Sequence, residues 1–300
     1  MNIRKKILAL LNRISPLNLQ GDAEIENNTE YELSCIINFY GRTELLKNIL
    51  SCLAEQDIDK NRFEVVMVED KGGTEDGASI ADLYSKQLNI KYITLTRNYG
   101  IMGYSRNLGT EQSTGKHILY LDDDTIILQN TFLSILLNKF GENQPDGIMA
   151  LGQASFCELN QQYQYHDPFY TTNRCMAYTR KVLNELAGFK SSIIGQEDVE
   201  FNIRLNLADK NIIKVSELQY FHPPLIQHNF RKSASVGLSY YNLKESYPFF
   251  IWILLLFNGC RYLPYGLISF KSRFLYQFKF SAGFLLGIIY GIQGKIVEYK

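Results

Sequence analysis

The stretch His117-Ile118-Leu119-Tyr120-Leu121-Asp122-Asp123-Asp124 joins an apolar run to three consecutive aspartates. Carboxylates this close together, at the carboxyl end of a buried strand, repel one another and desolvate badly unless a cation is present. Oxygen ligands of this kind suit Mg²⁺ or Mn²⁺, which proteins commonly share with substrate phosphates. A solvated, Asp-rich turn after a strand is the alternative, so the rest of the chain is needed to choose between them.

Apolar runs alternate with helical patterns along the chain before this stretch. Strands are predicted at 33–39, 63–69, 90–95 and 116–121, and helices at 43–55 and near 75–87, 103–113, 180–187 and 197–208. This alternation predicts an α/β fold with a mainly parallel central sheet and flanking helices. Open sheets of this kind bind ligands outside the carboxyl ends of their strands. Asp70 follows the second strand and the aspartate triplet follows the fourth, so both are expected at one edge.

The formal net charge of zero hides a strong asymmetry along the chain. Residues 1–21 carry four basic side chains and no acid, and residues 246–300 carry six basic side chains and one acid. Subtraction from the totals of 31 and 31 leaves 21 basic and 30 acidic residues in 22–245, a net charge of −9. Such an acidic body does not suit nucleic-acid binding. Its basic, apolar ends favour contact with an anionic membrane surface, with a C-terminal segment merely packed on the body as the alternative.

Both ends of the chain have compositions typical of membrane association. Residues 1–21 predict a basic amphipathic helix, because the apolar residues recur at helical spacing and Arg13 interrupts the run that a secretory signal needs. The uncharged runs 246–260 and 280–294 are each shorter than the ~20 residues of a spanning helix. The expected division is therefore an N-terminal segment (1–21), a body (22–235) and a membrane-associating, apolar helical C-terminal region (236–300). Peripheral or monotopic attachment to the cytoplasmic face of the inner membrane is expected, and five scattered cysteines suit a reducing compartment.

Several short motifs, taken in order, resemble the family 2 glycosyltransferases, whose nucleotide-sugar-binding fold is called GT-A. The matching blocks are 34–42, 64–70, 98–109, 121–124, 188–189, 195–198 with Arg204, and His228 with Ser233. The resemblance implies a GT-A fold and an inverting, metal-dependent enzyme of bacterial surface polysaccharide synthesis. The donor would be a UDP- or dTDP-sugar, and the acceptor a hydroxyl of a glycan or lipid-linked molecule.

Four residues are candidates for nucleotide binding under this resemblance. Phe39 and Tyr40 end the first strand, where an aromatic face can stack on a base, although two core aromatics would look the same in sequence. In the family, the carboxylate at the place of Asp70 accepts the imide N–H of uracil or thymine, and an Asx-turn is the local alternative. Arg106 lies on a predicted helix within reach of the base or diphosphate, and Asn107 is expected to brace its loop.

The aspartate triplet corresponds to the family's D-x-D motif. Mg²⁺ or Mn²⁺ held there would bridge the donor's diphosphate and offset the charge that develops on the leaving group. Asp124 is the expected direct ligand, and Asp122 and Asp123 are candidates for ribose and supporting contacts, with Asp122 also a possible ligand. His228 is expected to complete the metal shell or touch the diphosphate, and His222 competes for that role.

Glu197 and Asp198 correspond to the family's catalytic acids at the start of a helix. By resemblance Asp198 is the general base, which takes the proton of the acceptor hydroxyl as its oxygen attacks the anomeric carbon. One direct displacement then inverts the anomeric configuration. First-turn acids are also favoured by the helix dipole alone, which is the structural alternative for this pair.

Departures from the family pattern lie around the expected base pocket. Asn38 stands where the family usually has Pro, Gly41 where it often has Asn, and Glu69-Asp70-Lys71 replaces Asp-Asp-Gly. The sequence therefore specifies the nucleotide and sugar of the donor less well than it specifies the type of reaction. A catalytically silent nucleotide-sugar-binding scaffold and a nucleotidyltransferase are the alternatives. The retained Asp198 speaks against the first, and residues 38–42 are a poor match to the phosphate loop of the second.

Overall fold

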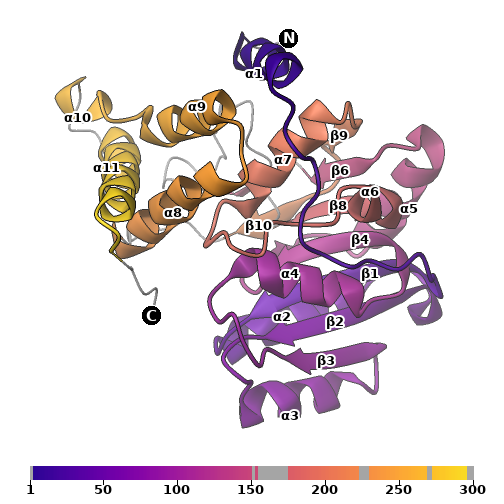
Figure 1. Cartoon of the computed structure of the whole chain (residues 1–300). Helices are drawn as coiled ribbons and strands as arrows, with labels where there is room; N and C mark the ends of the chain where they lie inside the picture. Colours follow the sequence, from indigo (N-terminus) through magenta and orange to yellow (C-terminus); the bar gives the residue numbers. More distant parts are fainter. Residues whose placement is uncertain (1–2, 151–152, 155–174, 223–229, 269–271, 296–300) are drawn as a thin grey trace.

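A seven-stranded sheet forms the centre of the protein (Figure 1). The computed structural model describes residues 3–150, 153–154, 175–222, 230–268 and 272–295. In order across the sheet the strands are β3 (Ile90–Thr94), β2 (Phe63–Glu69), β1 (Tyr31–Phe39), β4 (Gly115–Asp122), β8 (Cys175–Thr179), β6 (Gly147–Ala150) and β9 (Ile212–Val215). Only β8 runs antiparallel to its neighbours, whereas the other pairs are parallel. The predicted α/β fold with a mainly parallel sheet is confirmed.

Helices cover both faces of this sheet, and strand β2 is therefore buried along its whole length. One face packs against α2 (Thr43–Ala54), α3 (Glu75–Tyr84) and α5 (Phe132–Asn143). The other packs against α4 (Met102–Glu111), α6 (Arg180–Glu185) and α7 (Glu197–Leu207). Strand β1 serves both layers, because Cys35 and Ile37 join the first core and Ile36 joins the second. The predicted helices of this region are all present, with ends that differ by a few residues.

The register of the parallel strands brings their carboxyl ends to one edge. Phe39 of β1 lies opposite Glu69 of β2, and Asn38 lies opposite Asp122 of β4. Asp70 and the aspartate triplet therefore leave the sheet on either side of the end of β1, as the sequence predicts. A small second sheet follows, with strand order β5 (Ile126–Ile127), β10 (Tyr220–His222) and β7 (Gln153–Ala154), and β5 continues the chain from the triplet.

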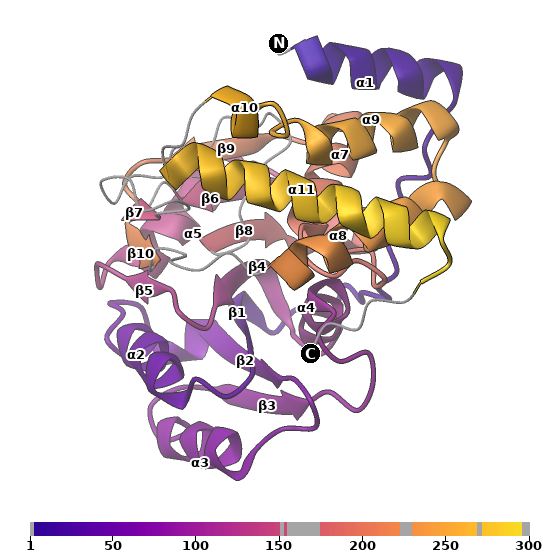
Figure 2. The same cartoon turned by 90° about the vertical axis from the view of Figure 1, so that its left-hand side faces the viewer.

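The C-terminal region is helical, and its helices pack on one another and on α7. It contains α8 (Phe230–Asn242), α9 (Phe249–Cys260), α10 (Tyr265–Ile268) and α11 (Ser272–Ile292). Glycines allow α8 and α11 to approach closely: a methyl group at Gly237 would lie 2.0 Å from the carbonyl oxygen of Phe284, and one at Gly287 would lie 2.0 Å from that of Ala234. Figure 2 shows α11 lying along α8, and both views place α1 (Ile3–Ile14) beside α9.

A third hydrophobic core joins the two ends of the chain to the body. Most of its members come from α1, α7, α8, α9 and α11, and include Leu8, Val199, Tyr240 and Phe284, while Tyr247 joins it from the segment between α8 and α9. Helix α8 also runs across the expected boundary between residues 235 and 236. The division at this point stays a prediction, and removal of residues after 245 would strip side chains from a core shared with α7.

Helix α11 is longer than the uncharged run 280–294 suggests, because it begins at Ser272 and includes Lys279. Among the described helices, its segment Leu275–Ile292 alone has the length and composition of a membrane span. Its exposed apolar side chains include Leu285, Ile289 and Ile292, which share one face.

Candidate active site

Asp70 fastens the end of β2 to the loop that precedes α4. Its Oδ2 accepts a hydrogen bond from the amide of Gly100 at 2.7 Å, and its Oδ1 accepts one from the amide of Lys71 at 2.7 Å. Its own amide donates to the carbonyl of Phe39 at 2.9 Å. Each carboxylate oxygen can accept more than one hydrogen bond, so these contacts leave capacity for a donor on a base. The local Asx-type contact and the expected base contact are therefore compatible.

The two aromatic residues at the end of β1 have different surroundings. Phe39 is 4% exposed and belongs to the core between the sheet and α2. Tyr40 is 47% exposed, and the Nζ atom of Lys71 lies 4.5 Å from its ring centroid. In this arrangement stacking on a base is open to the ring of Tyr40, whereas the side chain of Phe39 supports the pocket from the core.

Asp123 and Asp124 both pair with Arg42. Nη1 of Arg42 lies 3.3 Å from Oδ1 of Asp123 and 3.3 Å from Oδ2 of Asp124. Burial raises the pKa of Asp123 to about 7, the neighbouring charges of Asp124 and Asp122 add to that rise, and Arg42 opposes it. The carboxylates are thus crowded enough to require a positive charge beside them.

These carboxylates fit part of the coordination shell of a divalent cation. Hard oxygen donors from two adjacent acids are the ligands that Mg²⁺ and Mn²⁺ accept, and the Arg42 guanidinium already stands in as their counter-charge. Within the ranges described by the structure, no group of three or more His, Cys, Asp or Glu side chains lies together as a metal site. A bound donor's diphosphate would have to supply further ligands. His228 lies outside the described residues, and the backbone of His222 ends β10 beside that segment.

Arg106 links the two acidic motifs. It is buried on α4, where its Nη2 lies 3.2 Å from Oδ1 of Asp122 and its Nη1 forms an ion pair with Glu197. The sequence predicts that Arg106 lies near the base or diphosphate. In the structure its guanidinium instead pairs with one carboxylate of the aspartate triplet and one of the two acids at the start of α7. Removing either charge from such a buried arrangement leaves the other uncompensated, so Arg106 fixes the two motifs relative to each other.

Asn107, the next residue of α4, has the bracing role that the sequence predicts. Its Nδ2 donates to the carbonyl of Phe189 at 2.8 Å and to Oγ of Ser191 at 3.1 Å, while its Oδ1 accepts from the amide of Phe189 at 2.8 Å. These bonds fasten α4 to the segment that leads into the turn at Gly195 and Gln196, named the catalytic turn after the predicted catalytic acids that follow it. Asn107 therefore acts on the architecture of the site from its buried position.

The predicted catalytic acids begin α7 after an unusual turn. Gly195 and Gln196 have positive φ angles of 79° and 59°, which turn the chain sharply into the helix. Glu197 faces the interior and Arg106, whereas Asp198 is half-buried and its Oδ1 accepts from the amide of Val199 at 2.8 Å. The N-terminus of α7 also favours negative charge in this first turn.

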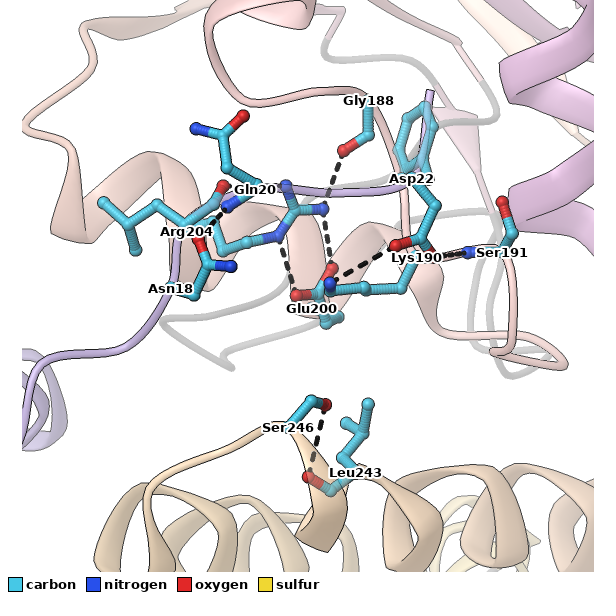
Figure 3. Close-up of polar contacts among 12 residues, drawn as sticks. Asn18, Gln20, Asp22, Gly188, Lys190, Ser191, Glu200, Arg204, Leu243 and Ser246 are labelled. Atoms are coloured by element: carbon cyan, nitrogen blue, oxygen red, sulfur yellow. Dashed lines mark hydrogen bonds and ion pairs between the residues drawn. The ribbon is translucent and has the colours of Figure 1, made fainter. Parts of the chain in front are cut away.

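Arg204, which is part of the matched motif, proves to be structural. It is fully buried and donates from Nε and Nη2 to the carboxylate of Glu200 at 2.7 and 2.8 Å. It also donates to the carbonyls of Leu186 and Gly188, each at 2.8 Å. Figure 3 shows the guanidinium between Glu200 and Gly188. Arg204 therefore anchors α7 to the segment before the catalytic turn.

Sequence reasoning missed Arg42 as a residue of the site. Arg42 belongs to a matched block and follows β1 at the same edge as the aspartates, which is a signal that could have indicated it. Its left-handed backbone (φ 48°) after Gly41 turns its side chain toward the triplet, and that orientation has no sequence signature.

Comparisons with known proteins identify the family of this chain. The family model described as Glycosyl transferase family 2 matches residues 34–194. The poly(ribitol-phosphate) beta-N-acetylglucosaminyltransferase TarS of Staphylococcus aureus is 34% identical over 223 residues, which cover 69% of this chain and 38% of that protein. This chain thus spans well under half the length of that relative.

Two solved structures share the fold. The S. aureus TarS structure with UDP-GlcNAc has a TM-score of 0.56 and 17% identity, covering 90% of this chain and 94% of that one. The mannosyltransferase PcManGT of Pyrobaculum calidifontis with GDP-Man and Mn²⁺ has a TM-score of 0.63 and 11% identity, covering 98% and 96%. These likenesses show that the protein has the GT-A fold. The chain belongs to glycosyl transferase family 2, whose model matches more than half of its length.

Proposed function

We propose that this protein is an inverting, metal-dependent glycosyltransferase that moves a sugar from a UDP- or dTDP-sugar to a hydroxyl of a glycan or lipid-linked acceptor. The observation that carries the proposal is the position of Arg106 between Asp122 and Glu197, which makes the two acidic motifs one site. The TarS relative is named as an N-acetylglucosaminyltransferase of poly(ribitol-phosphate), which supports a role in surface polysaccharide synthesis.

The residues divide the reaction between the two sides of the site. On the donor side, Asp70 and Tyr40 would bind the base, and Asp123 and Asp124 would hold Mg²⁺ or Mn²⁺ as well as position the diphosphate. Such a cation, when bound, neutralises charge on the leaving diphosphate. One structural neighbour was solved with UDP-GlcNAc and another with GDP-Man and Mn²⁺, which supports a nucleotide-sugar donor and a divalent cation.

On the acceptor side, Asp198 would take the proton of the attacking hydroxyl. Glu197 is paired with Arg106 in the interior, whereas Asp198 leaves the same helix turn on a less buried face. A carboxylate at a helix N-terminus can accept a proton as the acceptor oxygen attacks the anomeric carbon from the side opposite the nucleotide. That geometry yields inversion in one displacement, with no covalent glycosyl-enzyme.

Substitution of the two acids tests this mechanism. Asp198→Asn and Asp124→Ala should each lower sugar transfer at least about 10³-fold, because each removes a group that acts on the reacting atoms. Asp82→Asn, on the exposed side of α3, is the matched control and should retain activity. Transfer is followed by release of nucleoside diphosphate, with folding checked by thermal melting.

Other outcomes would favour the alternatives. Full activity in both variants would refute the assigned roles. Donor binding by calorimetry without transfer to any glycan or lipid extract would favour a silent scaffold, and release of pyrophosphate would indicate a nucleotidyltransferase.

We further propose that α1, α9 and α11 attach the protein to the cytoplasmic face of a membrane as a peripheral or monotopic surface. The proposal is supported by large exposed apolar side chains on α9, where Phe249 is 63%, Phe250 58% and Phe257 70% exposed. The basic residues of α1, which contacts α9, would meet anionic head groups.

Point substitutions test this attachment better than a truncation, because the C-terminal helices share a core with α7. Replacing Phe249, Phe250 and Phe257 together with Ser should abolish flotation with vesicles that contain anionic lipid. Leu83→Ser on α3, where Leu83 is 54% exposed, is the control. Unchanged flotation of the triple variant would contradict the assigned surface.

A further inference from the structure

The turn before the catalytic acids needs support from elsewhere in the molecule. Gly195 and Gln196 are both left-handed, and residues other than glycine rarely adopt this backbone conformation. Helix α7 starts at the next residue, so the direction in which Asp198 points depends on how residues 194–196 are held. No side-chain cap of α7 comes from Gln196 itself.

One face of α8 provides that support. The hydroxyl of Tyr240 donates to the carbonyl of Gln196 at 2.8 Å, and Oγ of Ser239 accepts from the amide of Ile194 at 3.2 Å. Val236 packs beside Gly195 in the same turn. Positions 236, 239 and 240 are spaced i, i+3 and i+4, so a single helix face makes all three contacts.

A second tyrosine from the C-terminal region holds α7 one turn further on. The hydroxyl of Tyr247 donates to the carboxylate of Glu200, which in turn holds Arg204. In Figure 3, Leu243 and Ser246 of the same region lie below Glu200 and Arg204. Burial raises the pKa of Tyr247 well above its usual range, so its hydroxyl stays protonated and remains a donor. Glu197, Glu200 and Arg204 share one buried face, and these contacts fix the rotation of α7 about its axis.

We propose that Tyr240, assisted by Tyr247, is a positioning residue for the general base. The two hydroxyls hold the catalytic turn and the first turns of α7 from α8 and the segment after it, so that Asp198 keeps its direction toward the acceptor hydroxyl. The hydrogen bonds of Tyr240 and Tyr247 to Gln196 and Glu200 are called the tyrosine clamp. The inference rests on the proposed function, since it gives this clamp a role in the transfer reaction. It also makes the C-terminal helices part of the catalytic architecture as well as a membrane surface.

Tyr→Phe variants test the clamp, because they remove one oxygen atom and leave the ring packing in place. Tyr240→Phe should lower kcat about tenfold while KM for the donor and Kd for UDP change less than twofold. Tyr247→Phe should lower kcat about threefold, since Arg204 still holds Glu200. Tyr241→Phe is the matched control: its hydroxyl contacts Lys244 on the side away from the catalytic turn, and kcat should not change.

Hydrogen–deuterium exchange provides a readout that does not depend on activity. The amides of residues 194–198 should exchange at least about fivefold faster in Tyr240→Phe than in the wild type, with exchange in the sheet unchanged. The proposal would be overturned if the Tyr240→Phe variant had the same kcat and the same exchange rates as the wild type. It would also be overturned if the variant lost kcat and UDP affinity to the same extent. If the wild-type protein transfers no sugar, the proposed function is refuted, and with it the effect of the clamp on catalysis. The exchange rates of residues 194–198 would still decide whether the clamp exists.

Discussion

The proposed donor side and the proposed acceptor side of this site are built in different ways. On the donor side, Asp70 and the aspartate triplet follow directly from the carboxyl ends of two parallel strands, and their positions result from strand register. On the acceptor side, Asp198 lies in the first turn of a helix, and Arg106, Tyr240 and Tyr247, all distant in sequence, contact this helix and the turn before it. A sheet edge collects ligands through its topology, whereas a helix terminus needs side-chain contacts to set its direction.

The largest expected effect comes from Arg106, because it joins the two sides. Arg106→Leu should destabilise the protein by about 3–5 kcal/mol, since Glu197 would be left buried without its counter-charge. Urea unfolding followed by circular dichroism measures the change. Arg62→Leu is the control, because Arg62 pairs with Glu32 in an exposed position where about 0–1 kcal/mol is expected. Equal effects of the two variants would show that Arg106 does not act as the link.

A pair of Gly→Ala variants compares the packing of the helical region with that of the sheet region. Gly287→Ala should destabilise by about 1–3 kcal/mol, because the new methyl group would collide with the carbonyl of Ala234 and separate α11 from α8. Gly141→Ala in α5 meets no atom within 4 Å and should stabilise by about 0.5–1 kcal/mol through its helix propensity. Thermal or urea unfolding measures the change in stability of both variants. A stabilising effect of Gly287→Ala, like that expected of Gly141→Ala, would contradict the close contact of α8 with α11.

The smallest effect is expected from His117, at the far end of β4 from the aspartates. Burial lowers its pKa to about 4, Lys116 adds to that shift and Glu32 opposes it. The folded state therefore keeps His117 neutral while the unfolded chain takes up a proton near pH 6.5. The neutral His117 therefore contributes fully to the free energy of unfolding above about pH 6.5. As the pH drops from 6.5 toward 4, the free energy of unfolding falls by about 1 kcal/mol, after allowance for the partial exposure of the ring.

His117→Phe keeps a ring against Phe140, whose centroid lies 4.0 Å from that of His117. Urea unfolding at several pH values between 7 and 4 should show a shallower loss of stability in the variant. Parallel curves for the variant and the wild type would contradict a neutral, half-buried His117 in the folded state.

Much of the donor side could be predicted from sequence. Apolar runs bounded by polar residues located β1 to β4, and the parallel order that they implied brought Asp70 and the triplet to one edge. The pairing of Arg106 with Glu197 could not be predicted, because residues 91 positions apart meet only after α4 and α7 pack against the same face of the sheet. The exposure of Tyr40 and the burial of Phe39 likewise depend on which side of β1 each residue leaves.

The sequence alone determined the α/β fold, the acidic motifs and the sheet edge that they share, because strand periodicity and turn residues are local properties of the chain. Only the tertiary structure decided that Arg106 joins those motifs, that Arg204 anchors α7, and that α8 holds the turn before Asp198. Those contacts combine buried charges and hydroxyls from separate elements. Their partners are selected by packing and by the cost of leaving a buried polar group unpaired, which no local pattern records.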